Sequence, residues 1–112
     1  VGAVSSTSIS FGTPVVYESA NTEAQAITFD SNSNKVVIAY RDYGNSQHGT
    51  AIVGTVDSSD NSISFGSAAV FNAAQTKVGG ITFDSNSNKV VIVYSDIGNG
   101  QKGTALIAEL IK

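Results

Sequence analysis

The residues best suited to chemistry are oxygen-bearing side chains that alternate along two identical segments. They are Asp30, Asn32 and Asn34 in the first segment, and Asp84, Asn86 and Asn88 in the second. This spacing is typical of the start of a calcium-binding loop, because calcium takes roughly six to eight oxygen ligands. Lysine replaces the glycine expected next, and no acid completes the set downstream. Asp and Asn are also common turn residues, so we expect a tight hairpin, with calcium binding as the alternative.

Catalytic chemistry has little support in this sequence. His48 is the only histidine, so it is the only imidazole that could act as a general base for a serine nucleophile. Cysteine is absent, so the chain has no thiolate nucleophile. The nearest pair of acids, Asp57 and Asp60, lies in a Ser-rich turn. We therefore expect no catalytic residues, no cofactor and no resident metal, and a protein that is not an enzyme.

Both calcium-like segments belong to a tandem repeat. Residues 27–38 read ITFDSNSNKVVI, and residues 81–92 repeat all twelve letters. Between 8–52 and 62–106, 28 of 45 positions match at a spacing of 54 residues. A unit of this size needs its neighbours to bury its apolar surface. We divide the chain, a single segment over residues 1–112, into repeat 1 at about 1–52 and repeat 2 at about 53–112.

Runs rich in β-branched and aromatic residues predict four strands in each repeat and no helix. The expected strands are Ile9–Tyr17, Ala26–Phe29, Lys35–Tyr40, Thr50–Val56, Ile63–Phe71, Gly80–Phe83, Lys89–Tyr94 and Thr104–Ile111. Strands such as VVIAY are apolar on both faces, which predicts a sheet covered on both sides. An antiparallel four-stranded sheet covered by copies of itself is the unit of a β-propeller. The residues expected between such sheets are Phe11, Phe29, Phe65, Phe83, Tyr40 and Tyr94.

Three motifs carry a resemblance to a known family. They are AITFDSNSNKVVIAYRD, the Asp-x-Gly-Asn turn before Gly-Thr-Ala, and SISFG at a strand start, and together they cover nearly the whole chain. In these motifs the chain resembles the blades of highly repetitive β-propellers of bacterial and phage-associated tandem arrays. The resemblance implies two blades per chain and an extracellular, phage-surface or cell-surface location. Sialidase-type propellers fit poorly, because Trp is absent and Arg41 is the only arginine.

Two blades cannot close a ring, since propellers have typically four to eight. The C-terminal blade lacks a fourth strand, whereas Ile9–Tyr17 is a fourth strand without a blade. We therefore expect a homo-oligomer that exchanges strands head to tail, a trimer or tetramer with about six or eight blades. A fragment excised or designed from a larger array is compatible with such a ring.

The two repeats differ most in residues 18–26 against 72–80 and in 41–48 against 95–102. In an up-and-down blade these segments share one rim. The candidate ligand-binding residues there are Arg41, Tyr43, Gln47, His48, Gln101 and Lys102. Such side chains suit hydrogen bonding and stacking on a sugar, although drift in exposed loops also explains the differences and is the simpler interpretation.

Charge and hydropathy limit the partners. The net charge is −3, and the six Lys and Arg are scattered, so nucleic acid has no basic surface to bind. No apolar run reaches the roughly 18 residues of a membrane-spanning helix. The sequence thus predicts a non-enzymatic, self-assembling propeller scaffold whose partner is itself. The alternative is a lectin-like module that recognises a carbohydrate or another surface through the rim.

Overall fold

The computed structural model describes residues 1–5 and 7–110 as an all-β chain with antiparallel pairing. Its strands are β1 (Gly2–Ser5), β2 (Ser8–Phe11), β3 (Thr22–Asp30), β4 (Lys35–Asp42), β5 (His48–Asp57), β6 (Ser62–Phe65), β7 (Ala69–Asp84), β8 (Lys89–Asp96) and β9 (Lys102–Ala108). Two short 3-10 turns, η1 (Tyr43–Asn45) and η2 (Ile97–Asn99), follow β4 and β8. In the described part, no helix is long and apolar enough to cross a membrane. The predicted all-β class is confirmed.

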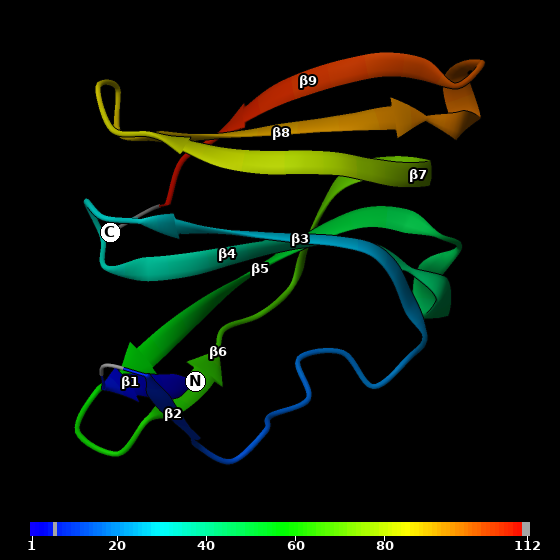
Figure 1. Cartoon of the computed structure of the whole chain (residues 1–112). Coiled ribbons are helices and arrows are strands. Elements are labelled where there is room, and N and C mark those ends of the chain that lie inside the picture. The colour runs from blue at the N-terminus through cyan, green and yellow to red at the C-terminus, as the bar shows by residue number, and fades with distance from the viewer. Residues whose placement is uncertain (6, 111–112) are drawn as a thin grey trace.

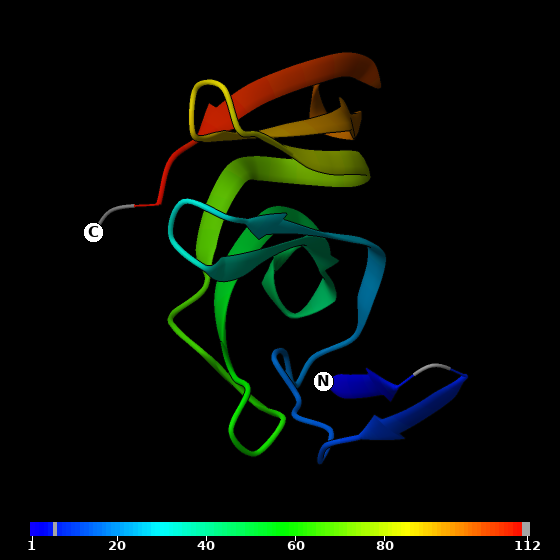
Figure 2. The ribbon, with the colours of Figure 1, turned by 60° about the vertical axis from the view of Figure 1, so that its left-hand side comes forward.

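Two sheets lie one above the other in Figure 1. We call β3–β6 the first sheet and residues 76–84 of β7 with β8 and β9 the second sheet. Each is an antiparallel meander. The two sheets are joined through β7, because residues 69–75 pair with β5 and residues 76–84 pair with β8. The turned view in Figure 2 shows β1 and β2 as a separate N-terminal hairpin.

The expected outer strand Ile63–Phe71 is wrong as one continuous strand. It is divided into β6 and the start of β7, and both pieces lie along β5. The division falls at residues 66–68, where the Gly66 amide still donates to the Val53 carbonyl at 3.0 Å. The expected strand Gly80–Phe83 is the end of the same long β7, which turns from one sheet to the other.

Other expected boundaries also change. Of the predicted strand Ile9–Tyr17, only residues 9–11 lie in a strand, as part of β2, because residues 12–17 have no ladder partner in the described chain. The predicted strand Thr104–Ile111 ends at Ala108 in β9, and residue 111 lies outside the described residues. The remaining predicted strands lie inside longer observed ones, since the polar residues that flank the apolar runs also pair.

The main core lies between the two sheets. Its buried residues are Val37, Ala39, Val78, Val90, Ile92 and Tyr94. Because side chains alternate along a strand, Ile38 and Tyr40 point to the opposite face of the first sheet. There they form a second cluster with Ile52, against which Tyr17 and Phe65 pack.

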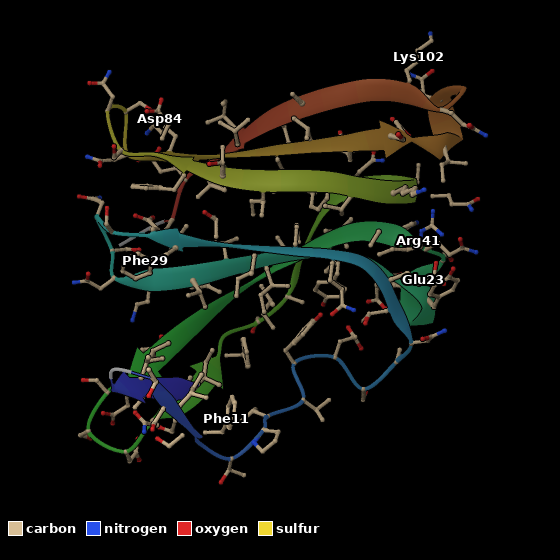
Figure 3. The ribbon with its side chains drawn as sticks, in the orientation of Figure 1. Phe11, Glu23, Phe29, Arg41, Asp84 and Lys102 are labelled. Atoms are coloured by element: carbon tan, nitrogen blue, oxygen red, sulfur yellow. The ribbon has the colours of Figure 1, made fainter. Side chains whose placement is uncertain are left out.

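Within the described chain, the aromatic residues expected between sheets are not all buried. Tyr40 and Tyr94 are buried, and Phe65 and Phe83 pack against the two clusters. In contrast, Phe11 is 77% exposed and Phe29 is 54% exposed. Neither of these two rings has an opposing sheet within the described chain, and Figure 3 shows Phe11 below both sheets.

Candidate functional site

Each sheet has an outer face that no second sheet covers within the described chain. The outer face of the first sheet carries Ile27, Phe29, Val36, Ile38 and Tyr40, with Tyr17 and Phe65 over part of it. The outer face of the second sheet carries Thr82, Val91, Val93, Ala105 and Ile107. Ile27 on the first of these faces is 60% exposed and Ile107 on the second is 63% exposed, so both faces present apolar surface to solvent.

The repeat relates these open faces to the buried ones. A shift of 54 positions converts the outer face of the first sheet into the inner face of the second, namely Ile81, Phe83, Val90, Ile92 and Tyr94. The same shift relates the outer face of the second sheet to the inner face of the first, namely Thr28, Val37, Ala39, Ala51 and Val53. The contact between the sheets therefore joins two different kinds of face, and the chain leaves one of each kind open.

One cross-strand pair differs between an inner face and an open face. On the inner face of the first sheet, Ala26 lies opposite Ala39. On the outer face of the second sheet, Gly80 lies opposite Val93. A Cβ added to Gly80 would lie 3.8 Å from a Val93 methyl carbon, an ordinary contact, so the open face has room for a methyl group there.

The aromatic contacts repeat as well. The Tyr17 ring meets Tyr40 edge to face at 5.2 Å and 67°, and the Phe71 ring meets Tyr94 at 5.2 Å and 65°. Phe71 lies at the start of β7, on the path that leads into the second sheet. Tyr17 therefore lies on an equivalent path into the first sheet.

At the rim, Arg41 connects the two sheets (Figure 3). Its Nε donates to the Thr76 carbonyl at 2.6 Å, and its Nη1 lies 3.4 Å from Glu23 Oε2. Nη1 also donates to the Tyr43 hydroxyl at 3.2 Å, and that hydroxyl donates to Glu23 at 2.8 Å. The Arg41 side chain is only 11% exposed. Two of the six predicted ligand-site side chains, Arg41 and Tyr43, thus bind each other and Glu23.

The other predicted rim residues lie at the two 3-10 turns. Gln47 and Gln101 both adopt φ of 60°, and their amides donate to the carbonyls of Asp42 and Asp96 at 2.9 Å. His48 begins β5, and Lys102 begins β9 at the same end of the molecule as Arg41 (Figure 3). The structure brings Arg41 and Tyr43 together and leaves Gln101 and Lys102 on the other sheet. The expected connecting loop 72–80 is instead part of β7.

Sequence reasoning missed Glu23, which holds both Arg41 and Tyr43. A signal was present, because the trio changes together between the repeats. Its counterparts are Lys77, Ser95 and Ile97. The arginine, its carboxylate partner and the tyrosine are thus replaced as one set, which indicates a contact network and not independent drift.

A second polar cluster surrounds Asp42, which is buried beside η1. Its Oδ1 accepts from the Gly44 amide at 2.9 Å. Burial raises the pKa of the Asp42 carboxyl, the charge and hydrogen bond of Glu18 raise it further, and His48 opposes the shift. Glu18 is held by the Tyr40 hydroxyl at 3.2 Å and the Ala20 amide at 3.1 Å. Burial and the Glu18 charge also raise the pKa of Tyr40.

In the second repeat, an amide side chain replaces the carboxyl group of Glu18. Asn72 takes the position of Glu18 and donates through Nδ2 to Asp96 at 3.2 Å and to Thr76 Oγ1 at 2.9 Å. An amide donor therefore faces the carboxylate in the second repeat. In the first repeat two carboxyl groups face each other, and a proton between them would satisfy the pair.

The calcium-like segments form the β3–β4 and β7–β8 hairpins. Asp30 Oδ1 accepts from the amides of Asn32 and Ser33 at 2.9 and 3.2 Å. The Ser87 hydroxyl and then the Asn86 amide lower the pKa of Asp84 in the matching turn. Asn34 and Asn88 close the turns at φ of 59°, a left-handed conformation that Asn tolerates. Among the described residues, no three His, Asp or Glu side chains gather as a metal site.

The open sheet faces are the largest unassigned feature of the chain. They present large apolar side chains, whereas the rim and the hairpins use their polar groups internally. No protein-family model, curated protein or solved structure matches this chain.

Proposed function

We propose that this protein is a non-enzymatic scaffold that assembles with itself, head to tail, into a closed ring of β-propeller blades. The outer face of the second sheet packs on the outer face of the first sheet of the next copy. One observation carries this proposal: at a shift of 54 positions, each open face corresponds to a face that is buried between the sheets, with Val93 and Ile107 in place of Ala39 and Val53.

A contact between two different faces is heterologous, and such contacts close into a ring when the rotation between copies allows it. In this proposal each chain supplies two blades, so three or four chains give about six or eight blades. The first sheet, with four strands, is a complete blade. The second sheet has three strands, and β2 of the neighbouring copy supplies the fourth.

Magnitudes favour a closed ring over an open pair. Four large side chains at the seam, Ile27, Phe29, Val93 and Ile107, are each roughly half exposed. Burying the exposed parts contributes on the order of 4 kcal/mol per seam. Two proteins lose about 4 kcal/mol or more of free energy through the freedom given up on association. One seam therefore barely offsets this loss, whereas closure gives each chain two seams and strand pairing adds to both.

The rim is a weaker basis for function. Arg41 and Tyr43 would be the main groups available to a sugar, and both are already bound to Glu23. We therefore assign the function to the faces.

Light scattering on the eluting protein tests this function. The expected mass is three or four times the 11.5 kDa of one chain. Val93→Glu places a charge on the outer face of the second sheet and should give a folded monomer. Ser58→Glu, in the exposed turn after β5, should leave the mass unchanged. A parent chain that is monomeric at micromolar concentration would overturn the proposal.

A further inference from the structure

The N-terminal hairpin copies the outer hairpin of the first sheet. The matched pairs are Gly2 with Phe11 and Val4 with Ile9 in the hairpin, and Gly54 with Phe65 and Val56 with Ile63 in the sheet. The next hydrogen bond is also copied, because the Gly12 amide donates to the Val1 carbonyl as the Gly66 amide donates to the Val53 carbonyl. Therefore β1 pairs with β2 in the same register in which the end of β5 pairs with β6.

The end of β9 offers the same positions a third time. By the repeat, residues 107–110 correspond to 53–56 and hence to 1–4. Lys35 Nζ lies 3.0 Å from Thr55 Oγ1, and Lys89 Nζ lies 2.6 Å from Glu109 Oε2. Glu109 thus occupies the position of Thr55 relative to the neighbouring strand. In the described chain, the outer edge of β9 has no strand beside it.

A groove of about 710 Å³ opens next to this edge, between the two sheets. Its walls include Val37, Ile52 and Ala108. In the first sheet, the backbone of Gly54, the counterpart of Ala108, lies directly against the Phe65 ring. A Cβ on Gly54 would come within 2.9 Å of that ring. The groove lies where a third copy of the Phe65 site would be, but Ala108 carries the Cβ that Gly54 lacks, so a ring entering the groove must lie farther from this strand than Phe65 does.

Phe11 is the ring that matches this groove. It has the same place in β2 as Phe65 has in β6. At 77% it is the most exposed large apolar residue of the hairpin. The match continues along the chain, because the exposed Val15 and Val16 correspond to residues 69–70, which pair with β5. Their partners on β9 would be Thr104 and Ala105.

We infer that β2 has two competing partners, namely β1 of its own chain and residues 107–110 of a second copy, where Phe11 enters the groove. This inference rests on the proposed assembly and specifies how its strands meet. The two partners offer the same four positions, so β2 cannot pair with both at once. In the single chain β2 pairs with β1, so assembly requires β1 to dissociate from β2.

Engineered disulfides separate the two pairings, since the chain contains no cysteine. Ser10→Cys with Glu109→Cys should give disulfides between chains, seen as a ladder on a non-reducing gel at unchanged oligomer mass. Ser10→Cys with Ala3→Cys should lock β2 to β1 and leave monomers, which reduction returns to rings. Thr55→Cys with Ser64→Cys is the matched control, because this pair lies in the same register within β5 and β6.

Two proline variants give a second test, because Val4 and Leu110 are counterparts in the two competing partners. Val4→Pro weakens β1 and should lower the concentration at which half of the chains assemble by about fivefold. Leu110→Pro weakens the partner on the second copy and should raise that concentration. Circular dichroism confirms that each monomer stays folded.

The outcomes distinguish this inference from the proposed function. If rings form, but the Ala3–Ser10 disulfide leaves them intact and the Ser10–Glu109 pair links no chains, β1 stays on β2 in the ring. That result overturns the inference and leaves the assembly through the faces standing. Chains that remain monomeric in every variant, the parent included, would overturn both.

Discussion

Phe29 and Phe83 occupy the same position in two identical twelve-residue segments, yet Phe29 is 54% exposed and Phe83 packs against the core between the sheets. The local sequence is the same, so the difference comes from the neighbours. Phe83 faces the first sheet, whereas no sheet in the described part of the chain faces Phe29. Asp30 and Asp84 differ in the opposite sense, since Asp30 is buried and Asp84 is exposed.

The two phenylalanines should therefore contribute unequally to the stability of the monomer. Phe83→Ala removes a ring from the packed core and should lower the free energy of unfolding by about 2 kcal/mol, less than for a fully buried ring. Phe29→Ala should change it by less than about 0.5 kcal/mol. Urea denaturation of dilute monomer measures both, and equal losses would contradict this description of the faces.

Arg41 should act as a clamp between the sheets. Arg41→Ser installs the residue found at position 95 and removes the hydrogen bond to the Thr76 carbonyl. We expect a loss of about 2 kcal/mol in the free energy of unfolding, as for a hydrogen bond with a charged donor. Lys102→Ser, at an exposed cation of the same rim, is the control and should change little. An equal effect of both variants would indicate a general charge effect.

The pair of Glu18 and Asp42 should make stability depend on pH. The pKa of Asp42 in the folded chain lies above its ordinary value of 3.8, so folding favours the protonated form. This stabilisation is fully present below that value and is lost as the pH rises through the raised pKa. Glu18→Asn should reduce the loss, because it removes the contribution of Glu18 but not that of burial, and an amide can donate to Asp42 as Asn72 donates to Asp96.

Urea midpoints between about pH 4 and pH 7 measure this dependence. The reverse substitution, Asn72→Glu, builds the same carboxyl pair in the second repeat and should add the dependence there. An unchanged pH profile in both variants would show that the pair does not share a proton.

Calcium should not stabilise the chain. The carboxylate of Asp30 already accepts hydrogen bonds from the amides of Asn32 and Ser33, and it closes the turn without an ion. Differential scanning calorimetry should give the same melting temperature with and without millimolar calcium. Asn34→Gly, which keeps the left-handed turn, should likewise have the same melting temperature with and without calcium. A melting temperature that rises with calcium concentration would establish the alternative site.

The parts of the fold that depend on local pattern could be predicted from the sequence. Lys35–Tyr40 lies within β4, and Asp30 to Asn34 form the expected turn, because alternation and turn chemistry act over a few neighbouring residues. The exposure of Phe29 could not be predicted, since it depends on which sheet lies opposite.

The same limit applies to contacts distant in sequence. The outer strand is divided into two pieces that both pair with β5, and Arg41 donates to the Thr76 carbonyl, 35 positions away. No periodicity within one segment contains such contacts. Comparison of the repeats recovers part of them, as the joint replacement of Glu23 and Arg41 shows.

The most direct test of head-to-tail assembly mixes two variants that are each blocked on one face. Phe29→Asp leaves the outer face of the second sheet intact, and Val93→Asp leaves the outer face of the first sheet intact. Each variant alone should be a folded monomer. Because one seam barely offsets the free energy lost on association, an equal mixture should give a weak 1:1 complex whose share rises with protein concentration and whose mass does not exceed twice 11.5 kDa. Light scattering that shows no complex in the mixture, or self-association of either variant alone, would contradict the assembly of unlike faces.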